Sequence, residues 1–150
     1  MGILSRILEH PWILVKKIVS REGKIHFRRW RLIETPWFNI YIHQVARSDE
    51  EKDAHDHPWW FASLILRGGY FEDLWTGDKY SHKVNFPGSL VVRKTSQFHK
   101  LRLMGGAPAW TLVLTGPKNH FWGYKTEDGW VDHVTYRQMK DASRPDVAAR

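Results

Sequence analysis

Two histidines separated by one residue, His55 and His57, carry the clearest chemical potential in this sequence. On an extended segment, side chains two positions apart point to the same side, so both imidazoles face one surface of a sheet. Neutral imidazole is a good ligand for iron, zinc, copper or nickel. A third nitrogen or oxygen ligand must come from elsewhere in the chain, and His99 is the candidate. The sequence therefore predicts a metal site built from His55, His57 and His99.

Composition restricts the remaining chemistry. The 150 residues include no cysteine, which excludes disulfides, thiolate metal ligands and a cysteine nucleophile, and fits a reducing cytoplasm. Any catalysis must use histidine, carboxylates, tyrosine or a metal. Lysine and arginine number 23 against 16 aspartates and glutamates, giving a formal net charge of +7. Because these cations are scattered along the chain, a solvated basic surface is favoured over a nucleic-acid site.

The elements that must position the histidines are short strands. The length fits one domain over residues 1–150. Between residues 37 and 134, strand-forming segments alternate with glycine and proline turn signals, and the tail 141–150 is polar and expected to fray. This pattern predicts an all-β barrel or jelly roll, which removes open sheet edges and encloses a pocket. The predicted strands are 37–45, 59–67, 70–75, 80–86, 89–93, 99–104, 110–115, 122–125 and 130–134, with looser alternation over 24–33 and a helical turn at 136–140.

Residues 1–22 have a different pattern. Their apolar residues recur at roughly helical spacing, and Pro11 predicts a break into two short helices, the second starting near it. Charged residues interrupt every apolar run, so no membrane-spanning segment is expected. We expect this helical extension to pack on the domain or on a second copy in a homodimer. The alternative is a basic helix lying on a membrane surface.

The order of these motifs resembles the two metal-binding motifs of the cupins. The first cupin motif pairs two histidines with a closing glycine one strand later, and the second places a histidine after a proline-glycine turn. In this chain the turn lacks one spacer residue and the histidine lies further from it than usual. The resemblance covers roughly residues 37–116 and implies a double-stranded β-helix. The matching residues are His55, His57 and Gly68 or Gly69 for the first motif, and Pro87, Gly88 and His99 for the second.

One departure from the cupin pattern changes the ligand set. Most metal cupins carry a glutamate four or five residues after the second histidine, where this chain has Phe61 and Ala62. Glu72 lies beyond the glycine turn and is not expected to replace it. The remaining three-histidine set is similar to that of the thiol dioxygenases, the cupin branch containing cysteine and cysteamine dioxygenase. The tetrapeptide 55–58 resembles the motif of cysteamine dioxygenase and plant cysteine oxidases, and the chain also resembles small bacterial and phage cupins.

This resemblance implies a non-heme Fe(II) dioxygenase, an oxidoreductase acting on a small molecule, although another divalent metal would also suit the site. Three neutral nitrogens on one side of Fe(II) leave up to three positions for substrate and dioxygen. The metal keeps a net charge of +2, which favours an anionic partner such as a thiolate. A wall of large rings from Trp59, Phe61 and Trp110 would exclude water from a reactive intermediate.

Three further residues are catalytic candidates. Tyr41 and His43 alternate on one strand face and could reach the open side of the metal as supporting or acid–base groups. Arg67 shares the strand parity of His57 and is a candidate for binding a substrate carboxylate. The competing interpretation is a barrel-lining tyrosine and histidine and a surface arginine. The other histidines, His10, His26, His82, His120 and His133, have no partner at ligand spacing and are assigned to packing or the surface.

Two other classes of function remain open at this stage. A metal-independent cupin isomerase or epimerase would use histidine and tyrosine as acid and base on a sugar nucleotide, whose pyrophosphate would suit the positive charge. A non-enzymatic module would use its basic N-terminal part to dock on a partner or on nucleic acid. Metal content separates the first hypothesis from the second, and salt-dependent binding to DNA would favour the third.

Overall fold

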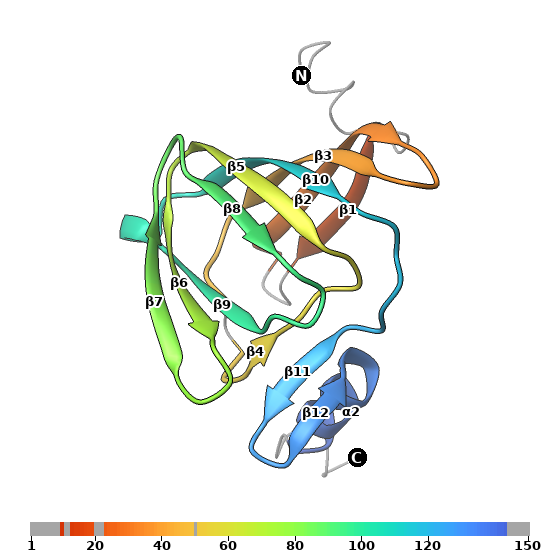
Figure 1. Cartoon of the computed structure of the whole chain (residues 1–150), viewed down its shortest axis with the longest axis vertical. Coiled ribbons are helices and arrows are strands. Elements are labelled where there is room, and N and C mark those ends of the chain that lie inside the picture. The colour runs from red at the N-terminus through yellow and green to blue at the C-terminus, as the bar shows by residue number, and fades with distance from the viewer. Residues whose placement is uncertain (1–9, 11–12, 20–22, 50, 144–150) are drawn as a thin grey trace.

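Two antiparallel sheets of six strands each face one another and enclose the interior in the computed structural model (Figure 1). The structure describes residues 10, 13–19, 23–49 and 51–143. One sheet has the order β1-β2-β3-β10-β5-β8, and the other has the order β12-β11-β4-β9-β6-β7. The elements are β1 Leu14–Val19, β2 Ile25–Glu34, β3 Asn39–Val45, β4 Ala54–His55, β5 Phe61–Arg67, β6 Tyr70–Trp75, β7 Tyr80–Asn85, β8 Leu90–Arg93, β9 His99–Leu103, the short 3₁₀ helix η1 Met104–Gly106, β10 Ala109–Thr115, β11 Gly123–Thr126, β12 Gly129–Asp132 and α2 His133–Ala142.

This arrangement is the double-stranded β-helix that the motif pattern implied. Consecutive segments pass back and forth between the two sheets, so that sequence-distant strands such as β3 and β10 become neighbours. Side chains alternate between the two faces of each strand. On β5, Phe61, Ser63 and Ile65 are buried while the residues between them are only partly covered. Alternate residues of a strand therefore point into the interior.

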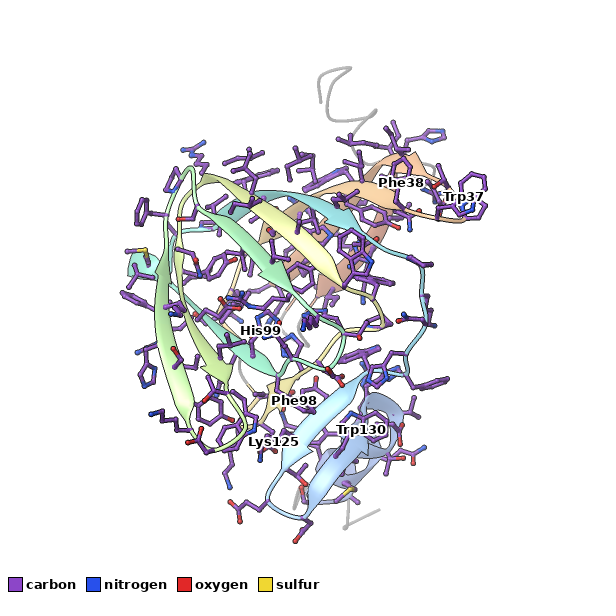
Figure 2. All side chains as sticks on the ribbon, in the orientation of Figure 1. Trp37, Phe38, Phe98, His99, Lys125 and Trp130 are labelled. Carbon is purple, nitrogen blue, oxygen red and sulfur yellow. The ribbon has the colours of Figure 1, made fainter. Side chains whose placement is uncertain are left out.

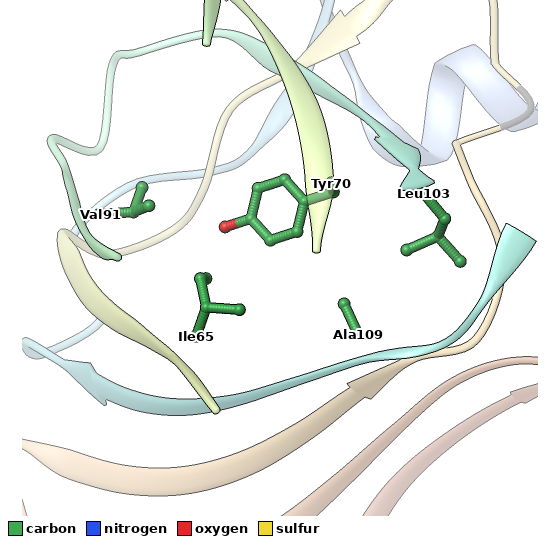
Figure 3. Close-up of a cluster of buried hydrophobic side chains, with 5 residues drawn as sticks. All are labelled: Ile65, Tyr70, Val91, Leu103 and Ala109. Atoms are coloured by element: carbon green, nitrogen blue, oxygen red, sulfur yellow. The ribbon is translucent and has the colours of Figure 1, made fainter. Parts of the chain in front are cut away.

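An apolar cluster closes one end of the interior. It consists of Ile65, Tyr70, Val91, Leu103 and Ala109, which come from five different strands and meet between the two sheets (Figure 3). Val45 and Leu101 pack against it. Burial of large apolar side chains contributes about 1.5–3 kcal/mol each, so this cluster holds the sheets at a fixed separation.

The predicted N-terminal helical extension over residues 1–22 is wrong where the structure describes it. Leu14–Val19 form the edge strand β1, which pairs antiparallel with β2. Three of its six residues are β-branched, and pairing with the free edge of β2 satisfies the backbone in a way that a helix here could not. The rest of the prediction, on residues 1–9, 11–12 and 20–22, lies outside the described residues.

The C-terminal end is more helical than its sequence pattern predicted. The predicted strand 130–134 ends at Asp132, and the predicted turn at 136–140 is part of α2. The carboxylate of Asp132 accepts hydrogen bonds from the backbone nitrogens of Val134 and Thr135, both at 3.0 Å, and so caps the helix. Within the described residues, no helix is long and apolar enough to cross a membrane.

Candidate metal centre

The three predicted histidine ligands meet inside the barrel. His55 on β4 and His99 on β9 are direct cross-strand partners, and His57 follows two residues after His55. One ring nitrogen from each histidine lies within 4.8 Å of the others. The Nε2 atoms of His57 and His99 are 2.7 Å apart. Figure 2 shows His99 in the interior between the two sheets.

A buried glutamate orients the ring of His99. Nδ1 of His99 lies 2.6 Å from Oε1 of Glu72, and Glu72 is fully buried on the neighbouring strand β6. Because the carboxylate can only accept, Nδ1 carries a proton, and Nε2 is the ring nitrogen left for a metal. Nε2 lies on the side of the ring that faces the other two imidazoles. A carboxylate holding the far nitrogen is the usual support for a metal-binding histidine.

Glu72 is itself held as a carboxylate. Burial alone would raise its pKa, but hydrogen bonds from His99 and from Arg93 lower the pKa of Glu72 to about 2. Arg93 donates from Nε to Oε1 at 2.9 Å and from a terminal nitrogen to Oε2, and Asn85 donates to Oε2 at 3.3 Å. This bidentate arginine pair fixes the carboxylate in the orientation that His99 requires.

Protonation of the other two histidines is disfavoured. Burial lowers the pKa of His55 to about 4. Burial lowers the pKa of His57 well below its usual value, with His99 and His55 adding to the effect. Both rings are therefore neutral near pH 7 and present free lone pairs. Neutral imidazoles that converge on one point are the donor set that a divalent transition metal needs, so the residues present fit such an ion.

The aspartate between the two histidines points the opposite way, as the period of an extended segment requires. Asp56 is 1% exposed, and its carboxylate accepts from the backbone nitrogen of Gly123 at 2.6 Å, Nε2 of His120 at 2.8 Å and Nε1 of Trp130 at 3.2 Å. These bonds tie the segment 55–57 to the loop before β11 and to β12. Asp56 therefore fixes the backbone from which the two histidines project.

A cavity of about 160 Å³ adjoins the three histidines. The sheet opposite the histidines supplies Arg29 from β2, His43 from β3 and Thr111 from β10, which are neighbours in one cross-strand row. Apolar and aromatic side chains complete the wall. The lining residues are Phe27, Arg29, His43, Val45, Asp49, His55, His57, Trp59, Phe61, Ser63, Tyr70, His99, Leu101, Thr111 and Val113.

His43 and Tyr41, two predicted catalytic candidates, lie side by side on β3 with a ring-centroid distance of 5.9 Å. His43 lines the cavity, and its Nε2 accepts a hydrogen bond from Nε of Arg29 at 2.9 Å. Burial, followed by the charge of Arg29, lowers the pKa of His43 well below its usual value. Tyr41 is buried beside the same guanidinium rather than among the lining residues.

Arg67 and Trp110 are not brought to the cavity. Arg67 is exposed at the end of β5, because Ile65 and the apolar cluster lie between it and the histidines. Trp110 faces away from the interior, because its neighbour Thr111 faces the cavity, and it stacks on Trp30 at 5.3 Å. Of the predicted aromatic wall, Trp59 and Phe61 do line the cavity.

The fold has known counterparts, although no family model and no curated protein matches the sequence. A cupin-2 domain protein from Rhodospirillum rubrum matches with a TM-score of 0.56 and 16% identity, covering 83% of this chain and 76% of that one. The chain has the cupin fold. Ectoine synthase from P. lautus is a second cupin-fold neighbour, with a TM-score of 0.55, 14% identity and coverage of 78% and 77%.

An iron enzyme is also among the cupin-fold neighbours. The Fe(II) form of HppE matches with a TM-score of 0.54 and 11% identity over 67% of this chain. The chain spans about half of that protein, 55% of its length. At such identities the likeness concerns the fold.

Sequence reasoning did not identify the residues that support the histidines. Glu72 was considered only as a metal ligand, and it instead hydrogen-bonds a ring on the adjacent strand. Leu74 is the direct partner of His99, so Glu72 is its diagonal neighbour, a relation that requires the β6–β9 register. Arg29 is one of the cations that the sequence analysis assigned to a solvated basic surface. Its position on the same strand face as Phe27 was the available signal.

Proposed function

We propose that the chain binds one divalent metal through His55, His57 and His99 and acts as a non-heme Fe(II) oxygenase on a small molecule. The observation that carries the proposal is the meeting of three imidazoles beside a cavity. The presence of an Fe(II) enzyme among the cupin-fold neighbours supports iron as the metal. A bound Fe(II) would supply coordination positions for dioxygen and for an anionic donor such as a thiolate. Thiol dioxygenation is the narrowest form of the proposal.

The chain's own residues have distinct proposed roles in this reaction. Glu72 keeps the proton of His99 on Nδ1, so that the opposite nitrogen stays available. The rings of Trp59 and Phe61 cover the cavity and exclude water from the reacting groups. His43 and Tyr41 lie beside Arg29, and we propose that they act on the substrate through this arginine.

The alternative of a sugar-nucleotide isomerase fits the cavity less well. Pockets that hold drug-sized ligands occupy about 300–1,000 Å³, whereas this cavity has about 160 Å³. A sugar nucleotide is larger than a typical drug-sized ligand. The cavity therefore favours a substrate of a few carbon atoms. The non-enzymatic binding module has no specific support from the cavity or the histidine cluster.

Metal analysis of purified protein tests the proposal. We expect about one iron per chain in protein prepared anaerobically with Fe(II), and loss of that iron in His57→Ala. His82→Ala is the matched control, because His82 is exposed and contacts Asp73 instead of the cluster. Oxygen consumption with a panel of small thiols then tests the narrow form. A wild-type chain that takes up no iron, zinc, nickel or manganese contradicts the proposal.

We also propose that the protein is cytoplasmic and forms a homodimer. The two copies would pair through the outer face of the sheet at β5, β8 and β10. Leu64, Leu90 and Leu112 form one cross-strand row on that face, and Ala62, Val92 and Leu114 form the next. Three residues of these rows, Leu90, Val92 and Leu114, are substantially exposed, and no charged side chain interrupts the two rows. A continuous apolar patch on a sheet supports pairing with a second copy of the same face. The absence of cysteine supports a reducing compartment.

A further inference from the structure

A second cavity, larger than the one beside the histidines, opens between β1 and α2. It has a volume of about 420 Å³ and shares no lining residue with the cavity of the metal centre. Lys16 from β1, Trp122 from the loop before β11 and several residues of α2 line it. Pockets that hold drug-sized ligands occupy about 300–1,000 Å³, so this cavity has room for a small organic molecule.

One face of α2 forms much of the cavity wall. His133, Arg137 and Asp141 recur every four positions along the helix, and Val134 and Gln138 do the same. Residues four apart lie above one another on a helix, so these five side chains form a single face. The cavity therefore receives polar and charged groups from a regular element.

Contacts on the neighbouring side of α2 hold that face in place. The hydroxyl of Tyr136 donates to the carboxylate of Asp53 at 3.0 Å, and the ring of Tyr136 stacks on Tyr124 of β11 at a centroid distance of 3.9 Å. At the start of the helix, the ring of His133 stacks on that of Trp122 at 4.3 Å, and Nδ1 of His133 donates to the carbonyl oxygen of Trp122 at 3.1 Å. The barrel thus fixes the orientation of the helix face that lines the cavity.

The cavity brings together two cations without an acidic partner. Within the described part of the chain, neither Lys16 nor Arg137 is at ion-pair distance from a carboxylate, including that of Asp141 on the same wall. Burial, followed by the charges of Arg29 and Arg137, lowers the pKa of Lys16 from its usual value. Both side chains are exposed enough for a ligand to reach them. Because the two cations repel each other, an anion between them would be stabilised by both.

The pairing of β1 with β2 places Lys16 at this cavity. Lys16 is the cross-strand partner of Arg29, so its side chain lies on the face of the sheet that is turned to the interior. Lys17 pairs with Arg28 and points to the opposite face. Two adjacent lysines therefore differ in position but not in charge, which makes Lys17 a matched control.

A phosphate group suits the two cations better than a carboxylate does. A phosphate monoester carries a charge of about −1.5 to −2 at pH 7 and three acceptor oxygens, so it can accept from Lys16 on one side and Arg137 on the other. Lysine binds phosphate as a point charge, and the planar guanidinium matches two phosphate oxygens. The amide of Gln138 adds a further donor on the same wall. The rings of Trp122 and His133 offer flat surface to the organic part of such a ligand.

We infer that this cavity is a second ligand site, which binds the phosphate group of a small organic phosphate through Lys16 and Arg137. The inference does not depend on the proposed function, because none of the lining residues belongs to the histidine cluster. The organic part of the ligand lies against Trp122, and the phosphate lies between β1 and α2.

Titration of phenyl phosphate into the full-length, metal-free chain at pH 7.5 tests the inference, with binding followed by isothermal titration calorimetry. Phenyl sulfate has a similar shape but a single charge, and inorganic phosphate lacks the ring. We expect phenyl phosphate to bind about fivefold more tightly than either comparison compound. Lys16→Gln and Arg137→Gln should each weaken its binding about tenfold, because each removes one charged partner of the phosphate. Lys17→Gln should leave the affinity unchanged.

Three outcomes of these titrations would overturn the inference. Equal weakening by Lys16→Gln and Lys17→Gln would show attraction to the net positive charge of the chain instead of a site. Inorganic phosphate that binds as tightly as phenyl phosphate would exclude an organic phosphate as the ligand. Phenyl sulfate that binds as tightly would exclude selection of phosphate.

A variant of the metal centre separates the two sites. His57→Ala should bind phenyl phosphate as tightly as the wild type, and loss of binding in that variant would place the anion at the histidines and overturn the inference. Wild-type protein that binds phenyl phosphate but takes up no metal contradicts only the proposed function. The thermal midpoint of the wild-type protein should rise with phenyl phosphate more than with phenyl sulfate, and an equal response to both overturns the inference without any variant.

Discussion

Glu72 on β6 accepts a hydrogen bond from His99 on the neighbouring strand β9, with Oε1 of the glutamate 2.6 Å from Nδ1 of the histidine. The pair lies on the inner face of the barrel, and both residues are buried. Arg93 neutralises the carboxylate from the other side. The chain of contacts from Arg93 through Glu72 to His99 therefore sets the tautomer of a proposed metal ligand before any metal binds.

Replacement of Glu72 by glutamine should weaken metal binding. The amide can still accept from Nδ1 of His99, but it lacks the charge that makes the ring a stronger donor and that pairs with Arg93. We expect the metal affinity, measured by competition with a chelator, to fall about 10–100-fold. The uncompensated Arg93 should also lower the free energy of unfolding by about 3–5 kcal/mol.

Asp73→Asn provides the control for that substitution. Asp73 is the next residue on β6, points the other way and contacts His82, which is exposed. Its replacement should leave metal affinity unchanged. Similar metal affinity in Glu72→Gln and Asp73→Asn would remove the supporting role assigned to Glu72.

Gly68 should tolerate alanine less well than another glycine with a positive φ. Its φ is +73°, and a Cβ atom there would lie 2.4 Å from the carbonyl oxygen of Pro108. Gly77 has a φ of +109° but open space around the position of a Cβ atom. Both alanine variants carry backbone strain of about 1–3 kcal/mol. Gly68→Ala should lose a further ~1–3 kcal/mol from the steric clash, measured as the difference in urea unfolding. Equal losses would show that the loop around Pro108 moves aside.

The sequence predicted the strands and the ligand histidines because both depend on local patterns. The period of two along residues 55–57 placed His55 and His57 on one side and Asp56 on the other, as observed. The edge strand β1 could not be predicted in this way, since its apolar spacing also fits a helix and only pairing with β2 decides. Arg29 and Glu72 depend on the register between strands far apart in sequence. A single sequence does not contain that information.

Acid should destabilise the metal-free protein through His43. The folded-state pKa of this histidine lies well below its usual 6.5, because burial and the charge of Arg29 disfavour the imidazolium. A histidine with a lowered pKa contributes its full stability above about pH 6.5 and loses that stability as the pH falls toward the folded-state pKa. The free energy of unfolding should thus decrease from pH 7 to pH 5, by up to about 1.4 kcal/mol per pH unit from this group.

His43→Gln isolates that contribution. Glutamine can accept the hydrogen bond from Arg29 but does not titrate. The variant should therefore show a shallower fall of stability between pH 6.5 and pH 5, while His55 and His57 titrate equally in both proteins. Parallel pH profiles for the variant and the wild type would contradict the lowered pKa of His43.

A substitution on the outer face of the first sheet should dissociate the proposed homodimer. Val92 on β8 is 56% exposed and lies in the apolar rows, whereas Val84 on β7 is 53% exposed on the other sheet. The wild-type chain of 17.8 kDa should show about twice that mass by light scattering at micromolar concentration. Val92→Lys should shift the mass toward a monomer, because it places a charge within the buried patch, while Val84→Lys should remain dimeric. A wild-type monomer, or dissociation by Val84→Lys alone, would move the interface away from this face. Since both variants add the same charge at nearly the same exposure, a difference between them reports the position of the contact rather than a general effect of the lysine.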